Sequence, residues 1–140
     1  MAKTKAMLLE EIYNLAFTKL VEAGSDEHNA SILSTVLRNA ERDGSHSHGL
    51  FRLPAYLTGL KSGKINGNAR ATISKITPSF IRVDGKQGLA PTAHNVAVPA
   101  LVTAAQKTGV AIAAIHRCFH MAALWPEVEA IAEKGLAAIA

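Results

Sequence analysis

Cysteine is scarce in this sequence of 140 residues, which contains only Cys118. One cysteine cannot form an internal disulfide, and low cysteine use fits a reducing compartment, so we expect a cytoplasmic protein. A thiol nucleophile also needs a base as its partner, and the sequence identifies none for Cys118. A cysteine-based enzyme is therefore the weaker interpretation of this residue.

Long hydrophobic runs are also lacking. The longest are residues 110–115 and 136–140, far shorter than the roughly 20 residues that cross a bilayer. Glu10 and Glu11 come too early for a secretory signal peptide. With 49% hydrophobic and 19% charged residues, the chain is too apolar to be disordered. We therefore predict one globular domain with a modest core and no membrane partner.

Aromatic residues make up only 5% of the chain, and they do not interleave with basic residues. The net charge is +4, but lysines and arginines are scattered, and no run exceeds two of them. Nucleic-acid binding usually relies on a clustered basic surface with aromatic stacking, so we expect no nucleic-acid partner. A scattered positive field suits a small anion better.

The first half of the sequence has helical periodicity. Apolar residues recur at helical spacing, which predicts helices over residues 5–23, 25–42 and 50–61. Ser25 is a natural N-cap for the second helix. Pro54 is tolerated only in a first turn, so the third helix must begin shortly before it. We expect turns between the third helix and the first strand.

The second half of the sequence mixes strand and helix patterns. A weak strand over 72–77 precedes a strand over 80–83, which Asp84-Gly85 should close as a turn. Residues 110–115 form a continuous apolar run, as expected for a strand buried on both faces. Together with the segments that follow, this run predicts a βαβ unit. The remaining expected elements are a helix over 92–107, a helix over 122–134 and a strand over 136–140.

These patterns predict an α/β (α+β) fold class with two regions. Residues 1–70 form a helical region that carries a histidine motif, and residues 71–140 form the first part of an α/β domain. The sequence ends on an apolar strand that nothing would cover. We therefore expect a truncated chain, or one that depends on a partner.

The histidine motif is GSHSHGLFRLP, residues 44–54. Histidine is the most common proton donor near neutral pH, and a neighbouring hydroxyl can fix its tautomer, so Ser47 and His48 form a candidate catalytic pair. If a helix begins close after His48, Arg52 projects on the same side. Arg52 could then grip a substrate carboxylate through two parallel hydrogen bonds.

Two alternatives remain open for this motif. Ser47 could be a helix N-cap, with His48 as a solvated residue of the first turn. His46 and His48 could also bind a metal ion, but no carboxylate or cysteine cluster completes such a site. We therefore predict no metal.

A second polar cluster spans residues 116–120, directly after the buried run. Ligands of α/β sheets bind outside the carboxyl ends of strands. His120 also precedes a helix N-terminus, which favours anions. The alternative is a mixed polar loop. No GxGxxG follows a strand, and residues 84–88 have too few glycines for that motif, so a Rossmann site is not indicated.

Three segments, in their order and spacing, resemble one family: SHGLFRLPAY at 47–56, VDG at 83–85 and HMAALW at 120–125. They are similar to the malate/L-lactate dehydrogenase family of NAD(P)-dependent oxidoreductases, which lack a Rossmann fold. Within it, AALWPEVEAIAEKGL at 122–136 resembles the branch that reduces Δ1-piperideine-2-carboxylate and Δ1-pyrroline-2-carboxylate. These substrates are cyclic imines that carry a carboxylate.

The resemblance implies roles for individual residues. His48 would be the proton donor, Ser47 its relay partner and Arg52 the clamp on the substrate carboxylate. The cofactor would be NADPH, with NADH as the alternative. The residues expected to line its site are His120, Met121, Ala122, Ala123 and Leu124.

The resemblance also implies an architecture, in which a helical region precedes a mixed-sheet, non-Rossmann NAD(P)-binding domain in a homodimer. Family members are more than twice as long, so a catalytic aspartate and further cofactor contacts would lie beyond residue 140. Met121 stands where the family commonly has phenylalanine.

The leading function is NADPH-dependent reduction of the cyclic imine to L-pipecolate or L-proline, with this chain as an N-terminal fragment. Three alternatives remain. The chain could belong to a malate/L-lactate-type 2-hydroxyacid dehydrogenase, it could be a truncated or split product that is inactive alone, or it could be a histidine-rich metal module.

Overall fold

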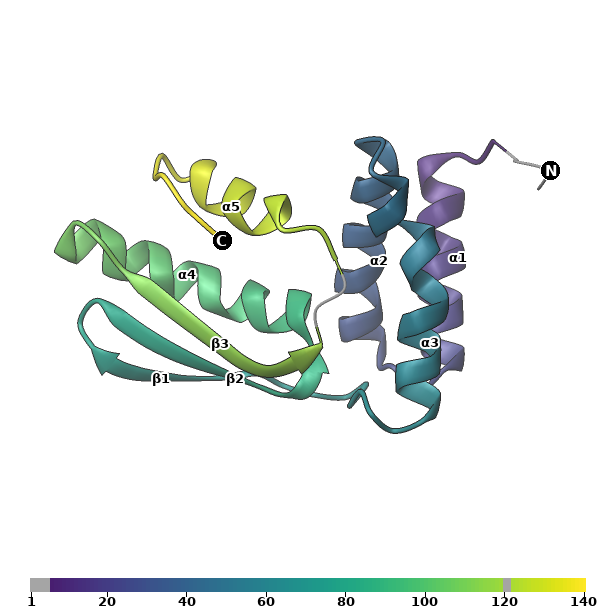
Figure 1. Ribbon diagram of the computed structural model, residues 1–140, viewed down its shortest axis with the longest axis horizontal. Helices are drawn as coiled ribbons and strands as arrows, with labels where there is room; N and C mark the ends of the chain where they lie inside the picture. The colour runs from purple at the N-terminus through teal and green to yellow at the C-terminus, as the bar shows by residue number, and fades with distance from the viewer. Residues whose placement is uncertain (1–5, 120–121) are drawn as a thin grey trace.

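The computed structural model describes residues 6–119 and 122–140, in a helical layer and an α/β layer (Figure 1). The helical layer contains α1 (Leu9–Glu22), α2 (Glu27–Arg42) and α3 (Leu53–Lys61). Two short 3-10 turns, η1 (His46–His48) and η2 (Leu50–Arg52), connect α2 to α3. The predicted order of three helices in the first half of the chain is confirmed.

The α/β layer contains β1 (Thr72–Thr77), β2 (Phe80–Leu89), α4 (Ala90–Thr108), β3 (Ile112–Phe119) and α5 (Trp125–Ala132). The described strands form one sheet in the order β1-β2-β3, with β1 antiparallel and β3 parallel to β2. The sheet is therefore mixed, as the family resemblance implied. No helix in the described residues is long and apolar enough to cross a membrane.

The core of the helical layer is made by the apolar faces of its helices. Leu20, Leu33, Leu37 and Tyr56 are fully buried there. Burying side chains of this size is the main force that joins amphipathic helices. Pro54 lies in the first turn of α3, as predicted.

Asp26, rather than Ser25, caps α2, because its carboxylate accepts a hydrogen bond from the Asn29 backbone N–H at 2.9 Å. The predicted Ser25 cap is one residue early. Ser25 is buried instead, and its hydroxyl donates to the Asp26 carbonyl at 3.1 Å.

A buried asparagine ties the helical layer to the loop that enters the sheet. Asn29 on α2 is fully buried, and its side-chain amide donates to the carbonyls of Gly67 at 2.8 Å and Ala69 at 3.1 Å. A Cβ at Gly67 would collide with the backbone of Gly24. The missing side chain at Gly67 therefore permits this close contact.

A parallel βαβ crossover, β2–α4–β3, forms the α/β layer. α4 covers one face of the sheet (Figure 1), where Ile81 and Val83 of β2 pack against Ala93 and Ala97 of α4. Gly109 ends α4 in the left-handed conformation, with φ of 81°. α5 lies on the α4 side of the sheet.

The path of β2 differs from the prediction. Asp84-Gly85 does not close the strand, since β2 continues to Leu89 through an irregularity of register between Asp84 and Gly88. Lys86 and Gln87 have positive φ angles of 53° and 59°. The Asp-Gly pair begins a bulge instead of a turn, because the chain leaves β2 into a crossover helix and not into a hairpin.

The predicted strands at the end of the chain are also wrong in part. Residues 110 and 111 lie outside β3, and β3 is an edge strand rather than one buried on both faces, with Ile112 62% exposed. Residues 136–140 form no strand. Apolar runs of this length cannot distinguish a strand from an irregular segment that packs on a helix.

Candidate active site around His48

The histidine motif folds as two 3-10 turns that a glutamate of α2 supports. The Oε1 atom of Glu41 accepts the Leu50 backbone N–H at 2.7 Å, and its Oε2 atom lies 2.5 Å from Nδ1 of His46. Between the turns, a Cβ at Gly49 would collide with this carboxylate. Glu41 and Gly49 therefore fix the path of the motif together.

Two hydroxyl groups meet the same nitrogen of His48. Nδ1 lies 3.0 Å from Oγ of Ser47 and 3.2 Å from Oγ of Ser45. Within the described residues, no hydrogen bond reaches Nε2, and the side chain is partly exposed. Nε2 is therefore the atom of His48 that can exchange a proton with a ligand. The structure thus brings together the predicted Ser47–His48 pair.

Ser45 is a residue of this site that was not predicted from the sequence. The spacing indicates this contact, because Ser45 is three residues before His48. In a 3-10 turn, the side chains of residues i and i+3 lie directly above one another. The His48 backbone N–H donates to the Ser45 carbonyl at 2.8 Å and closes that turn.

Arg52 reaches the motif by a route other than the predicted one. α3 begins at Leu53, so His48 and Arg52 do not share a helical face. Instead, Nε of Arg52 donates to the Ser47 carbonyl at 2.9 Å, and the guanidinium lies 5.8 Å from the centre of the Phe51 ring. Arg52 is thereby tied to the residue next to His48.

Two alternatives were open for the motif, a helix N-cap at Ser47 and a metal site at His46 and His48. Ser47 caps no helix, because it lies inside η1 and its hydroxyl faces His48. The N-cap interpretation is therefore wrong. His46 faces Glu41 while His48 faces the serines. The described residues hold no group of three or more metal-binding side chains.

Trp125, the first residue of α5, contacts the motif from the other layer. Its ring stands edge-on to His48, with 6.2 Å between ring centres and 77° between planes. Its indole N–H donates to Oδ2 of Asp43 at 3.2 Å. Arg42 also hydrogen-bonds Asp43, at 2.7 and 3.0 Å, and lowers the pKa of that carboxyl below its ordinary value. Asp43 is therefore an ionised acceptor for the indole.

The residues expected to line a cofactor site are placed only in part. His120 and Met121 lie outside the described residues. Ala122 and Ala123 are buried and line a cavity of about 350 Å³, whereas Leu124 is half exposed. Glu127, Glu129 and Glu133 line the same cavity. The alanines suit an uncharged ring of a dinucleotide, but the carboxylates do not suit its phosphates, so this cavity does not fit a whole NAD(P) molecule.

Residues 116–119 of the second polar cluster belong to β3 and not to a loop after it, and His120 lies outside the described residues. Arg117 forms an ion pair with Asp84 of β2, with Nε 2.9 Å from Oδ1. Cys118 is partly buried, and this burial, with the charge of Glu127, raises the pKa of its thiol. A protonated thiol is a poor nucleophile, so Cys118 is disfavoured as one. The ion pair between Asp84 and Arg117 braces the β2 bulge.

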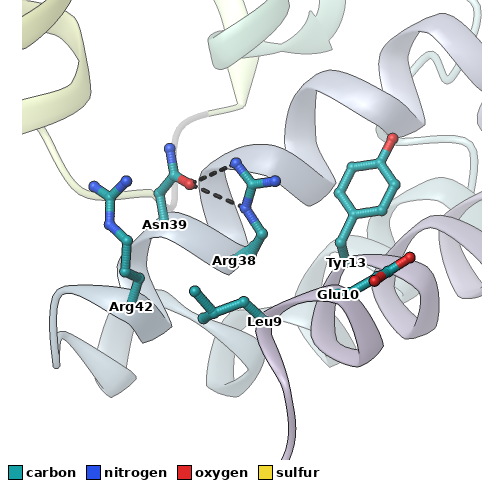
Figure 2. Close-up of a pocket in the computed structure, with 6 residues that line it drawn as sticks. All are labelled: Leu9, Glu10, Tyr13, Arg38, Asn39 and Arg42. Atoms are coloured by element: carbon teal, nitrogen blue, oxygen red, sulfur yellow. Dashed lines mark hydrogen bonds between the residues drawn. The ribbon is translucent and has the colours of Figure 1, made fainter.

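A separate surface cavity of about 490 Å³ lies between α1 and α2 (Figure 2). The Arg38 guanidinium donates to Oδ1 of Asn39 through Nε at 3.1 Å and Nη2 at 2.9 Å, and it lies over the Tyr13 ring. Neither serine of the motif nor His48 lines this cavity. It is therefore not part of the candidate site.

Comparisons with known proteins agree with this architecture. The family model described as malate/L-lactate dehydrogenase matches residues 8–140. A Δ1-pyrroline-2-carboxylate reductase of Ancylobacter novellus is 43% identical over 130 residues, which cover 93% of this chain and 38% of that protein.

Solved structures give the same result. The Δ1-piperideine-2-carboxylate reductase of Pseudomonas syringae pv. tomato is 39% identical with a TM-score of 0.88, and the match covers 94% of this chain and 40% of that one. Malate dehydrogenase of Pyrococcus horikoshii shares the fold, with a TM-score of 0.83 at 23% identity, over 96% of this chain and 41% of that one. The chain thus spans about 40% of the length of these relatives.

Proposed function

Because this chain belongs to the malate/L-lactate dehydrogenase family, we propose that it carries the proton-donating site of an NADPH-dependent reductase of a cyclic imine carboxylate. The substrate is Δ1-pyrroline-2-carboxylate or Δ1-piperideine-2-carboxylate, which are named for the relatives, and the product is L-proline or L-pipecolate. The observation that carries the proposal is the pair of hydroxyls on Nδ1 of His48, which leaves Nε2 for the substrate.

His48 acts as the general acid. In its protonated form both ring nitrogens carry hydrogen, so Nδ1–H donates to a serine hydroxyl while Nε2–H donates to the imine nitrogen. NADPH, when bound, would supply the hydride that reduces the imine carbon. The proton on Nε2 then passes to the nitrogen of the substrate, and the imidazole is left neutral.

Arg52 binds the substrate carboxylate. Its Nε is occupied by the Ser47 carbonyl, so the two terminal nitrogens of the guanidinium are the ones directed to a ligand. A carboxylate accepts two parallel hydrogen bonds from such a pair. Because Arg52 is tied to the residue before His48, the carboxylate is held at a fixed place relative to the proton donor.

The proposal extends to cofactor, compartment and assembly. NADPH is the preferred cofactor and NADH the alternative, with Ala122 and Ala123 as part of the apolar wall. The single cysteine supports a cytoplasmic location. An apolar cavity of about 630 Å³ between α4, β3 and residues 136–140 supports a homodimer, or dependence on a C-terminal half of the kind that the relatives contain.

The test compares substrates on two proteins. One is the chain as it stands, and the other is the chain joined after Ala140 to the corresponding C-terminal region of the Ancylobacter novellus reductase. NADPH oxidation is followed with the cyclic imines and with 2-oxoacids. We expect the fusion to prefer an imine, and His48→Gln to slow it by about 100-fold or more at near-wild-type cofactor affinity.

Two outcomes contradict the proposal. A fusion that binds NADPH but prefers a 2-oxoacid would make this a malate/L-lactate-type 2-hydroxyacid dehydrogenase. Normal turnover by His48→Gln would remove the proton-donor role. His46→Gln is the matched control, because His46 lies two residues away and faces Glu41.

A further inference from the structure

None of the roles proposed above involves Trp125 or Asp43, yet Trp125 contacts His48 and hydrogen-bonds Asp43. We propose that Trp125 is a positioning residue for His48, and that Asp43 anchors the indole so that α5 fixes the tilt of the imidazole. The catalytic consequence rests on the proposed function, whereas the contact itself can be tested without any turnover.

The hydrogen bonds of His48 leave one motion unrestrained. Both serine hydroxyls lie at Nδ1, on one edge of the ring. The ring can still tilt about that edge, and such a tilt would move Nε2 away from a bound substrate. The edge-on contact with Trp125, at 77° between planes, blocks this tilt because a large flat ring stands beside the imidazole.

The indole is itself held in place. The N–H of an indole can only donate a hydrogen bond, so its orientation depends on a fixed acceptor. Asp43 is that acceptor at 3.2 Å, and two hydrogen bonds from Arg42 hold its carboxylate. Pro126, in the first turn of α5, restricts the backbone next to Trp125.

The contact joins two distant parts of the chain. Asp43 and Trp125 are separated by 82 positions, and α5 belongs to the α/β layer while Asp43 ends α2. Ala122 to Leu124, which are expected to line the cofactor site, directly precede Trp125. A shift of that segment would therefore reach the proton donor through the indole.

Fluorescence reads this contact directly, since Trp125 is the sole tryptophan. The emission of an indole depends on the groups that touch its ring. We expect the emission at pH 7 to change in His48→Gln and to keep its wild-type value in His46→Gln, because only His48 contacts the ring among these two. Unchanged emission in His48→Gln would overturn the contact.

Nuclear magnetic resonance tests the positioning role. We compare the ring signals of His48 in Trp125→Phe, which keeps an aromatic ring but loses the N–H, and in Trp125→Leu, which loses both. We expect one narrow set of signals in the wild type and broadened or doubled signals in Trp125→Leu, with Trp125→Phe between them. Unchanged signals in both variants would overturn the role.

Kinetics of the fusion protein then separate positioning from folding. With rates corrected for the folded fraction, we expect Trp125→Leu to lower kcat by about 10-fold to 100-fold, as for a catalytic group displaced by about 1 Å. The KM for the imine should change little, because Arg52 holds the carboxylate. A raised KM with unchanged kcat would overturn the positioning role. An inactive wild-type fusion would count against the proposed function only, since the fluorescence and resonance tests do not need turnover.

Discussion

Two hydroxyl groups at one nitrogen of His48 serve both protonation states of the ring. A hydroxyl donates when Nδ1 is bare and accepts when Nδ1 carries a proton. The ring is therefore held at the same place before and after proton transfer. Ser47 and Ser45 are partly redundant in this role, because both lie within hydrogen-bonding distance of Nδ1.

Redundancy of the serines gives a kinetic prediction for the fusion protein. We expect Ser45→Ala and Ser47→Ala each to lower kcat by less than about 10-fold, and the double variant to lower it by about 100-fold, the scale of a general-acid contribution. Steady-state kinetics at saturating NADPH measure this difference. If Ser47→Ala alone were as slow as the double variant, Ser45 would have no role at His48.

The bulge of β2 is an element whose stability depends on charge. The Arg117 guanidinium and the Lys86 backbone N–H bind the Asp84 carboxylate and hold its pKa well below the ordinary value. A carboxyl with a depressed pKa in the folded state stabilises the fold above its unfolded pKa of about 3.9. That contribution is lost as the pH falls through the folded-state pKa.

Asp84→Asn tests the charge of the bulge. We expect the variant to unfold at lower urea concentration than the wild type at pH 7, because it loses the ion pair with Arg117. The difference should narrow as the pH falls below about 4, because Asp84 then gains a proton in the unfolded state but stays ionised in the folded state. Glu10→Gln, which changes an exposed carboxylate on α1, is the control. A difference that is constant with pH would show that the charge of Asp84 is not involved.

Elements with a repeating local pattern were predictable, and elements defined by their neighbours were not. The helical segments and Pro54 in the first turn of α3 follow from spacing and from proline geometry. The turn predicted at Asp84-Gly85 is a bulge, because the next element is a crossover helix that the Asp-Gly pair does not encode. Residues 136–140 are equally apolar in either environment, so their hydropathy could not distinguish a strand from an irregular segment.

One buried polar residue contributes to the connection between the two layers. Asn29→Ala would remove the two buried hydrogen bonds to the carbonyls of Gly67 and Ala69, and the loss of two such bonds costs about 1–3 kcal/mol together. We expect the free energy of unfolding to fall by about that amount, as measured by urea denaturation. Asn68→Ala, at an exposed asparagine of the same loop, should change it by less than about 0.5 kcal/mol. Equal effects of the two substitutions would contradict the role of Asn29.

The apolar side of the α/β layer predicts association. Val110 and Ile112, at 68% and 62% exposure, lie beside the cavity between α4 and β3. Exposed apolar surface next to an edge strand favours pairing with another chain. We expect the isolated chain to form oligomers in light scattering as its concentration rises, and Ile112→Lys to weaken them. A monomer that binds NADPH with micromolar affinity would contradict both this prediction and the idea of a product that is inactive alone.

At the scale of the whole molecule, the local sequence determined the features that involve only a few neighbouring residues. Helical spacing, the proline positions, the Ser47–His48 pair and the family motifs needed no knowledge of distant contacts. Tertiary structure decided the rest, because it depends on segments that pack far from their own place in the chain. Only the packing of α5 against the end of α2 brings Trp125 to His48, and only the path through η1 and η2 turns Arg52 toward the Ser47 carbonyl instead of along a helix. The sequence therefore indicated the chemical groups of the candidate site, but not the contacts that hold these groups in place.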